Sequence, residues 1–185
     1  MLFRLCAFGA FVSVFIAISV SKAELINSYS VGLGDSVSYV QIEFDNDHTY
    51  VFDVAYVDDG SVNGWDLMQI IETELPTILS MQYETYSWGN WLQGLSVEND
   101  HAFGTGAGFP DLDDYWAYWV APPGTDADWE FSSVGADNRL VSDGSWDGWT
   151  FHPSGATPPQ AIPGPSVLAL LLLPVLGAKR RRQLP

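Results

Sequence analysis

Aromatic side chains on either side of a glycine-rich stretch could form a binding surface for a ligand. Trp88 and Trp91 precede the stretch 104–108, and Trp116 and Tyr118 follow it. Trp and Tyr rings present flat apolar faces that stack on sugars and other planar molecules. If the domain has a ligand site, we predict that it includes Trp116 and Tyr118 with Trp88 or Trp91.

The aromatic run 115–119 also has a purely structural interpretation. On a strand, Tyr115, Ala117 and Trp119 would face one way, and Trp116 and Tyr118 the other. One set is expected in the core, and the other is either exposed or covered by a neighbouring element. If both sets are packed, this strand has no exposed aromatic ring on which a ligand could stack.

Closely spaced acidic residues could bind calcium through their carboxylate oxygens. None of these groups continues into the repeated acidic pattern and final glutamate of an EF-hand loop. We therefore predict no cofactor and keep calcium as an alternative to turns and solvated loops. The groups are Asp45 with Asp47, Asp111 with Asp113 and Asp114, and Asp126 with Asp128.

The chain has little that predicts catalysis. His48, His101 and His152 are scattered, and neither an HExxH nor a GxSxG motif is present. The only cysteine, Cys6, lies in the apolar N-terminal segment. A pair of carboxylates for glycoside hydrolysis would be hidden among so many acidic residues. We predict a protein that is not an enzyme.

The charge distribution excludes nucleic acid as a partner. All 23 acidic residues lie between Glu24 and Asp147, a stretch in which Arg139 is the only Lys or Arg. The body therefore has a formal net charge of about −22, and it has no basic patch to neutralise phosphates. Its many Trp, Tyr and β-branched residues are enough for a hydrophobic core, so we expect one folded domain.

Hydrophobic periodicity predicts an α+β fold that is mostly β, with one main helix. Apolar residues alternate over 40–44 and 50–56 around a polar turn at 45–48, which indicates a β-hairpin. A helix is predicted over 63–75, capped by Asn63 with Asp66 three residues later, and ended by Pro76. Further strands are expected within 83–97, 115–120, 129–133 and 149–151.

The order of hairpin, helix and further strands resembles the transcobalamin-like C-terminal β-grasp domain. The matching stretches are the helix 65–75, Gly94-Leu95-Ser96, the aromatic strand 115–119, and Asp143-Gly144-Ser145 leading into 148–151. The resemblance implies a β-grasp-like sheet with one main helix. It implies no particular ligand, because the family includes cobalamin binding and many unassigned roles.

The N-terminus has the features of a secretory signal peptide. Arg4 precedes the apolar run 8–20, and Ser21-Lys22-Ala23 places small residues where signal peptidase cuts. The run is shorter than the roughly 20 residues of a membrane-spanning helix. We predict cleavage after Ala23, against the alternative of an uncleaved anchor.

The C-terminus has the order of parts of a sorting signal. Pro163, Gly164, Pro165 and Ser166 precede the apolar run 167–178, and the basic cluster Lys179, Arg180, Arg181 and Arg182 follows it. The run is short for a bilayer, and the basic cluster should stay cytoplasmic. This order resembles the PEP-CTERM signal that exosortases recognise, with Gly164 in place of its glutamate. An ordinary tail anchor is the alternative.

Together these features predict four segments: a signal peptide (1–23), a β-rich domain (24–151), a Pro/Gly linker (152–162) and a sorting tail (163–185). We expect an exported protein at the cell surface or in the extracellular matrix, with transient membrane contact through the tail. The expected partners are signal peptidase, an exosortase-like enzyme, and an extracellular polysaccharide or small ligand. The expected role is non-catalytic binding or structure. The alternative is a secreted carbohydrate-active enzyme or accessory module.

Overall fold

The computed structural model describes residues 23–104, 114–124, 128–152 and 157–162. These residues form a mostly β domain with a single α-helix and a short 3₁₀ turn, as the sequence predicts for its fold class. The elements are β1 (Glu24–Gly32), β2 (Ser36–Glu43), β3 (His48–Tyr56), α1 (Gly64–Glu74), β4 (Leu79–Tyr86), β5 (Gly89–Val97), β6 (Asp100–Phe103), β7 (Tyr115–Ala121), β8 (Glu130–Phe131), η1 (Ala136–Asn138) and β9 (Trp146–His152).

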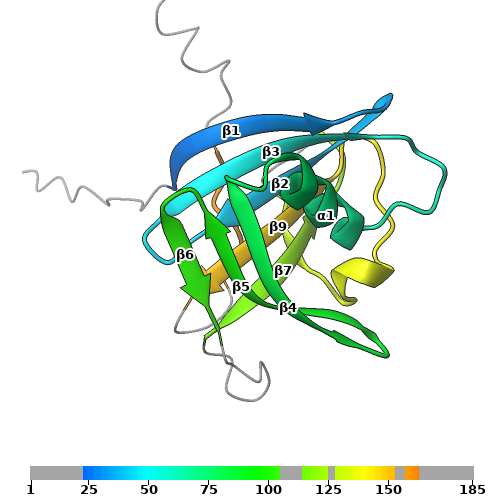
Figure 1. Cartoon of the computed structure of the whole chain (residues 1–185). Coiled ribbons are helices and arrows are strands. Elements are labelled where there is room, and N and C mark those ends of the chain that lie inside the picture. Colours follow the sequence, from blue (N-terminus) through cyan, green and yellow to red (C-terminus); the bar gives the residue numbers. More distant parts are fainter. Residues whose placement is uncertain (1–22, 105–113, 125–127, 153–156, 163–185) are drawn as a thin grey trace, which may run out of the picture.

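Two sheets and the helix enclose the core (Figure 1). The larger sheet has the strand order β1-β3-β2-β9-β7-β8, and the smaller has the order β4-β5-β6. The larger sheet is mixed: β1 runs parallel to β3 and β2 parallel to β9, whereas its other pairs are antiparallel. Helix α1 and the smaller sheet lie over one face of the larger sheet, so the buried side chains collect between these two layers.

The predicted hairpin and helix are present. Strands β2 and β3 pair in register from Ser36 with Tyr56 to Glu43 with Thr49. The side chain of Asn63 accepts hydrogen bonds from the backbone of the first turn of α1, and Asp66 bonds back to the Asn63 N–H. This reciprocal cap satisfies donors that a helix start leaves unpaired.

Some strands differ from the predicted ranges. Strand β1 has no counterpart in the sequence prediction, and the stretch 83–97 belongs to two strands joined by a turn between Tyr86 and Gly89. The predicted strand 129–133 shrinks to β8, and 149–151 lengthens into β9. Within the described ranges, no helix is long and apolar enough to cross a membrane.

Residues 157–162, which we call the C-terminal strap, lie against the outer face of the larger sheet. The Gln160 N–H donates to Glu43 Oε2 at 2.8 Å, and Gln41 Nε2 donates to the Gln160 carbonyl at 2.9 Å. Pro159 is buried. Burial raises the pKa of the Glu43 carboxyl, although the bonds from Gln160 oppose this. The end of the predicted linker is therefore part of the folded domain.

Candidate functional site

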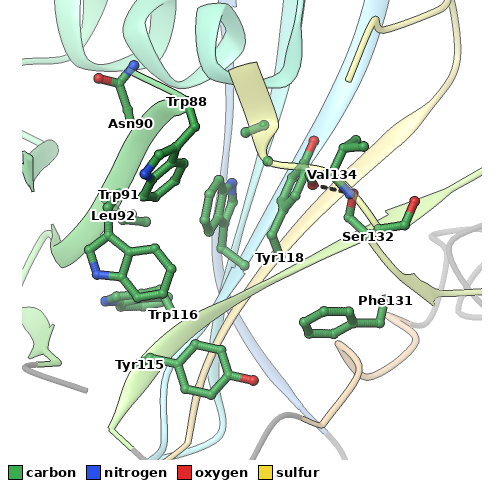
Figure 2. Close-up of a pocket in the computed structure, with 14 residues that line it drawn as sticks. Trp88, Asn90, Trp91, Leu92, Tyr115, Trp116, Tyr118, Phe131, Ser132 and Val134 are labelled. Atoms are coloured by element: carbon green, nitrogen blue, oxygen red, sulfur yellow. Dashed lines mark hydrogen bonds between the residues drawn. The ribbon is translucent and has the colours of Figure 1, made fainter. Parts of the chain in front are cut away.

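An aromatic cavity of about 250 Å³ lies between β5, β7, β9 and the segment that follows β8. Figure 2 shows Trp88, Trp91 and Trp116 on one side and Phe131, Ser132 and Val134 on the other. Seven of the lining residues are aromatic, and none of the lining residues in the described part of the chain is charged. The lining residues are Trp88, Asn90, Trp91, Leu92, Tyr115, Trp116, Tyr118, Phe131, Ser132, Ser133, Val134, Gly135, Ala136 and Trp149.

The lining residues differ in exposure. Trp88 is 57% exposed and Phe131 is 55% exposed, whereas Trp116 and Tyr118 are buried. The Trp88 ring stacks on Tyr86 with their centroids 5.1 Å apart and their planes 4° apart. The cavity therefore has an exposed aromatic rim, with Trp88 at a hairpin tip and Phe131 on β8, and a floor within the hydrophobic core.

A buried polar network lies beneath the floor. The Tyr118 hydroxyl donates to Asp147 Oδ1, and Arg139 Nη1 lies 3.2 Å from Asp147 Oδ2. This second contact is at ion-pair distance, but the two atoms are not aligned for a hydrogen bond. Burial raises the pKa of Asp147 to about 6, and Arg139 and Tyr118 oppose this rise. Burial and the nearby Asp147 charge raise the pKa of Tyr118 well above its usual value, so its hydroxyl stays a donor.

Several polar side chains at the cavity are already hydrogen-bonded to the protein. Asn90 Nδ2 donates to Asp137 at 2.6 Å, and Asn90 Oδ1 accepts from Thr85 at 2.7 Å. Ser132 Oγ donates to the Val134 carbonyl at 2.8 Å. Trp149 differs, because its buried indole N–H has no hydrogen-bond partner among the described residues. The wall therefore offers a ligand mainly aromatic rings.

The structure brings together all four aromatic residues predicted as ligand contacts. Trp88 lies in the turn between β4 and β5, Trp91 lies near the start of β5, and Trp116 and Tyr118 come from β7. The alternating faces of β7 are both packed. Trp116 and Tyr118 belong to the main core, whereas Tyr115, Ala117 and Trp119 form a second cluster with Trp129 on the outer face. The platform is thus the wall of a cavity and not an open strand face.

Sequence reasoning did not predict most of the wall. The segment 131–136 and Trp149 line the cavity opposite or beneath the predicted rings. No hydrophobic period marks 131–136, because only Phe131 of this segment belongs to a strand. Trp149 had a detectable signal, since it lies on a predicted strand, but nothing local indicates that β9 pairs with β7.

Several predicted features lie outside the described residues. These are residues 1–22 of the predicted signal peptide, the glycine-rich stretch from 105 onward, Asp111, Asp113, Asp126, and the sorting residues of 163–166 and 179–182. Asp45 and Asp47 lie at the β2–β3 turn. In the ranges that the structure describes, no three His, Cys, Asp or Glu side chains form a group that could hold a metal ion.

Comparisons with known proteins identify no family. No protein-family model matches the chain, and no curated protein matches it. Among solved structures, it is similar to a protein of Ruminococcus gnavus described as a "putative metal binding protein". The two are 17% identical with a TM-score of 0.41, over 64% of this chain and 98% of that one. We draw no functional conclusion from so distant a likeness.

Proposed function

We propose that this chain is an exported protein of the cell surface or extracellular matrix whose folded domain binds a small ligand without transforming it. The observation that carries this proposal is the convergence of Trp88, Trp91, Trp116 and Tyr118 on one uncharged cavity. Ligand pockets are typically concave and mainly apolar, with a few polar groups that orient the ligand. Binding is proposed to need no cofactor.

The proposed route to the surface begins with cleavage after Ala23. Strand β1 begins at Glu24, and the Glu24 N–H donates to the Asp47 carbonyl at 2.9 Å. A new N-terminal amine at Glu24 could still make this bond, so cleavage there would leave the domain intact. An exosortase-like enzyme would then remove the tail near Pro163 to Ser166.

Intact-mass measurement of protein isolated from its host tests this route. The expected mature protein starts at Glu24 and lacks Lys179 to Arg182. A mature species that keeps this basic cluster would refute processing of the tail, and one that keeps residues 1–23 would refute the signal peptide.

A binding role fits the cavity better than glycoside hydrolysis. That reaction generally needs two carboxyl groups about 5–10 Å apart across the scissile bond. The cavity wall in the described residues has no Asp or Glu side chain. A carbohydrate-binding accessory module is the second candidate, and the exposed stack of Tyr86 on Trp88 favours it because such rings can pack against sugar faces.

A thermal-shift and tryptophan-fluorescence screen of the protein in its natural form tests the binding proposal. The ligands to screen are glycans, corrinoids and calcium, together with small organic molecules. A ligand of the cavity should raise the melting temperature with the logarithm of its excess over the dissociation constant. The Trp88→Ala variant should reduce this shift, and Phe103→Ala, at an exposed ring on β6, should keep it. Equal shifts in both variants would place binding elsewhere.

A further inference from the structure

We propose that the cavity binds a small organic cation with a trimethylated or quaternary ammonium group. This inference rests on the proposed binding function, because it names the chemical class of ligand for the same cavity. Three independent observations support it: the aromatic wall, the sign of the surrounding charge, and the hydrogen bonds that already engage several polar side chains at the cavity.

The wall supplies the interaction that such a cation needs. An ammonium group close to the face of a Trp, Tyr or Phe ring is attracted by the electron-rich π system, most strongly by Trp. Seven aromatic side chains line the cavity, and four of them are Trp. Several rings around one cation form an aromatic cage, an arrangement that binds ammonium groups without hydrogen bonds.

The electrostatic environment favours a cation over a neutral or anionic ligand. The body of the protein has about 22 net negative charges, and its single basic side chain, Arg139, is paired with Asp147. Asp137 accepts two hydrogen bonds from Asn90, which is itself a wall residue, so its carboxylate lies at the edge of the cavity. The charge of Asp137 also acts on Tyr118 at the floor. No Lys or Arg lines the cavity in the described residues to oppose a bound cation.

The polar groups at the wall are too few for a sugar. A sugar ring has several hydroxyl groups, and each one that is buried without a partner is unfavourable. Asn90, Tyr118 and Ser132 already bond to the protein. The buried Trp149 indole N–H has no hydrogen-bond partner among the described residues. A quaternary ammonium group forms no hydrogen bond, so its binding does not depend on these polar groups.

The size of the cavity also suits a small cation. An apolar cavity of about 150 Å³ can hold benzene. A cavity of about 250 Å³ therefore has room for a trimethylammonium group and a short chain. The exposed rings of Trp88 and Phe131 place the rim of the cavity at the protein surface.

Choline and its neutral isostere test the charge requirement directly. The protein in its natural form is titrated with choline chloride, tetramethylammonium chloride, 3,3-dimethylbutanol and glucose, with tryptophan fluorescence and melting temperature as readouts. 3,3-Dimethylbutanol has the shape of choline with carbon in place of nitrogen. We expect both cations to bind, the isostere to bind at least tenfold more weakly than choline, and glucose not to bind. Sodium chloride should weaken choline binding, because salt screens the surrounding negative charge.

Two variants locate the binding. Trp88→Ala should weaken choline binding several-fold, and it should remain folded because Trp88 is mostly exposed. Phe103→Ala removes an exposed ring outside the cavity and should bind choline as the unsubstituted protein does. Circular dichroism checks that both variants are folded.

The other outcomes would contradict the cation, its location or the binding function itself. Equal affinity for choline and its isostere would refute the cation and leave an apolar ligand in the proposed cavity. Binding of glucose alone would refute the cation in favour of the carbohydrate module. Choline binding that is unchanged by Trp88→Ala would move the cation site elsewhere. Failure of every small molecule in both screens would refute the cation and the binding function together.

Discussion

Substitution of Gly64 by alanine tests whether the contact between α1 and the polar network beneath the cavity is as tight as the structure indicates. Gly64 is the first residue of α1 and is buried. A methyl group there would overlap the Tyr118 hydroxyl and lie 2.9 Å from Asp147 Oδ1. Both neighbours are buried, so neither can move away without disturbing the core.

The expected sign follows from comparing two opposing effects. Alanine is a better helix former than glycine by about 1 kcal/mol within a helix, which would stabilise the variant. Overpacking of a core costs about 1–3 kcal/mol, and loss of a buried hydrogen bond to a charged group costs about 1.5–3 kcal/mol. We expect a net loss of about 2–4 kcal/mol in the free energy of unfolding, which lowers the melting temperature by roughly 10 °C for a domain of this size.

Gly135→Ala is the matched control. Gly135 has φ of −67°, and a methyl group there would meet nothing within 4 Å. This variant should be as stable as the unsubstituted protein or more stable by up to about 1 kcal/mol, because alanine restricts the unfolded chain. Urea unfolding of both variants measures the difference.

A double-mutant cycle with Tyr118→Phe assigns the cause. Removal of the hydroxyl makes room for the methyl group of Ala at position 64, so Gly64→Ala should cost at least about 1 kcal/mol less in the Phe background. Additive effects, or a Gly64→Ala variant as stable as the Gly135→Ala control, would refute the proposed contact.

Three further predictions concern stability. Burial raises the pKa of Asp147 from 3.8 to about 6. Between pH 3.8 and pH 6 this carboxyl is therefore mostly protonated in the folded protein and mostly ionised in the unfolded chain. This contribution to stability is full below about pH 4 and is lost as the pH rises through 6. Stability relative to Asp147→Asn should therefore fall by about 2 kcal/mol from pH 4 to pH 7 in urea unfolding. Asn63→Ala removes two backbone hydrogen bonds at the start of α1 and should cost about 1 kcal/mol in thermal unfolding, and no loss would contradict the cap. A chain that ends at Ile162 should be more stable by about 1–3 kcal/mol than one that ends at His152, because the strap adds hydrogen bonds to the sheet. Equal urea midpoints for these two chains would show that the strap does not contribute.

The elements that the sequence predicts correctly are those whose signals are local. The alternation of Val40, Ile42 and Phe44 continues across a polar turn, so both strands of the β2–β3 hairpin can be located from their own residues. The cap of α1 needs only Asn63 and Asp66, three residues apart. Each of these signals depends on neighbours along the chain.

The missed features depend on contacts between distant segments. Strand β1 is an edge strand with mostly exposed residues, so its hydrophobic pattern is weak, and it is held by parallel pairing with β3. The aromatic cluster of the cavity could be predicted from the density of rings alone. Its opposite wall could not, because 131–136 reaches the cavity only through the packing of β7 against its neighbours.

The strap also sets a tether length for the proposed sorting step. The Gln160 N–H is hydrogen-bonded to the Glu43 carboxylate, so the folded domain ends close to Ile162. Five residues lead from Ile162 to Val167, where the apolar run begins, and an extended chain covers at most about 3.6 Å per residue. The domain would thus stand no more than about 18 Å from the start of the run. A processing enzyme that cuts within this gap would have to approach between the lipid surface and the folded domain, and release of the strap from the sheet would lengthen the gap.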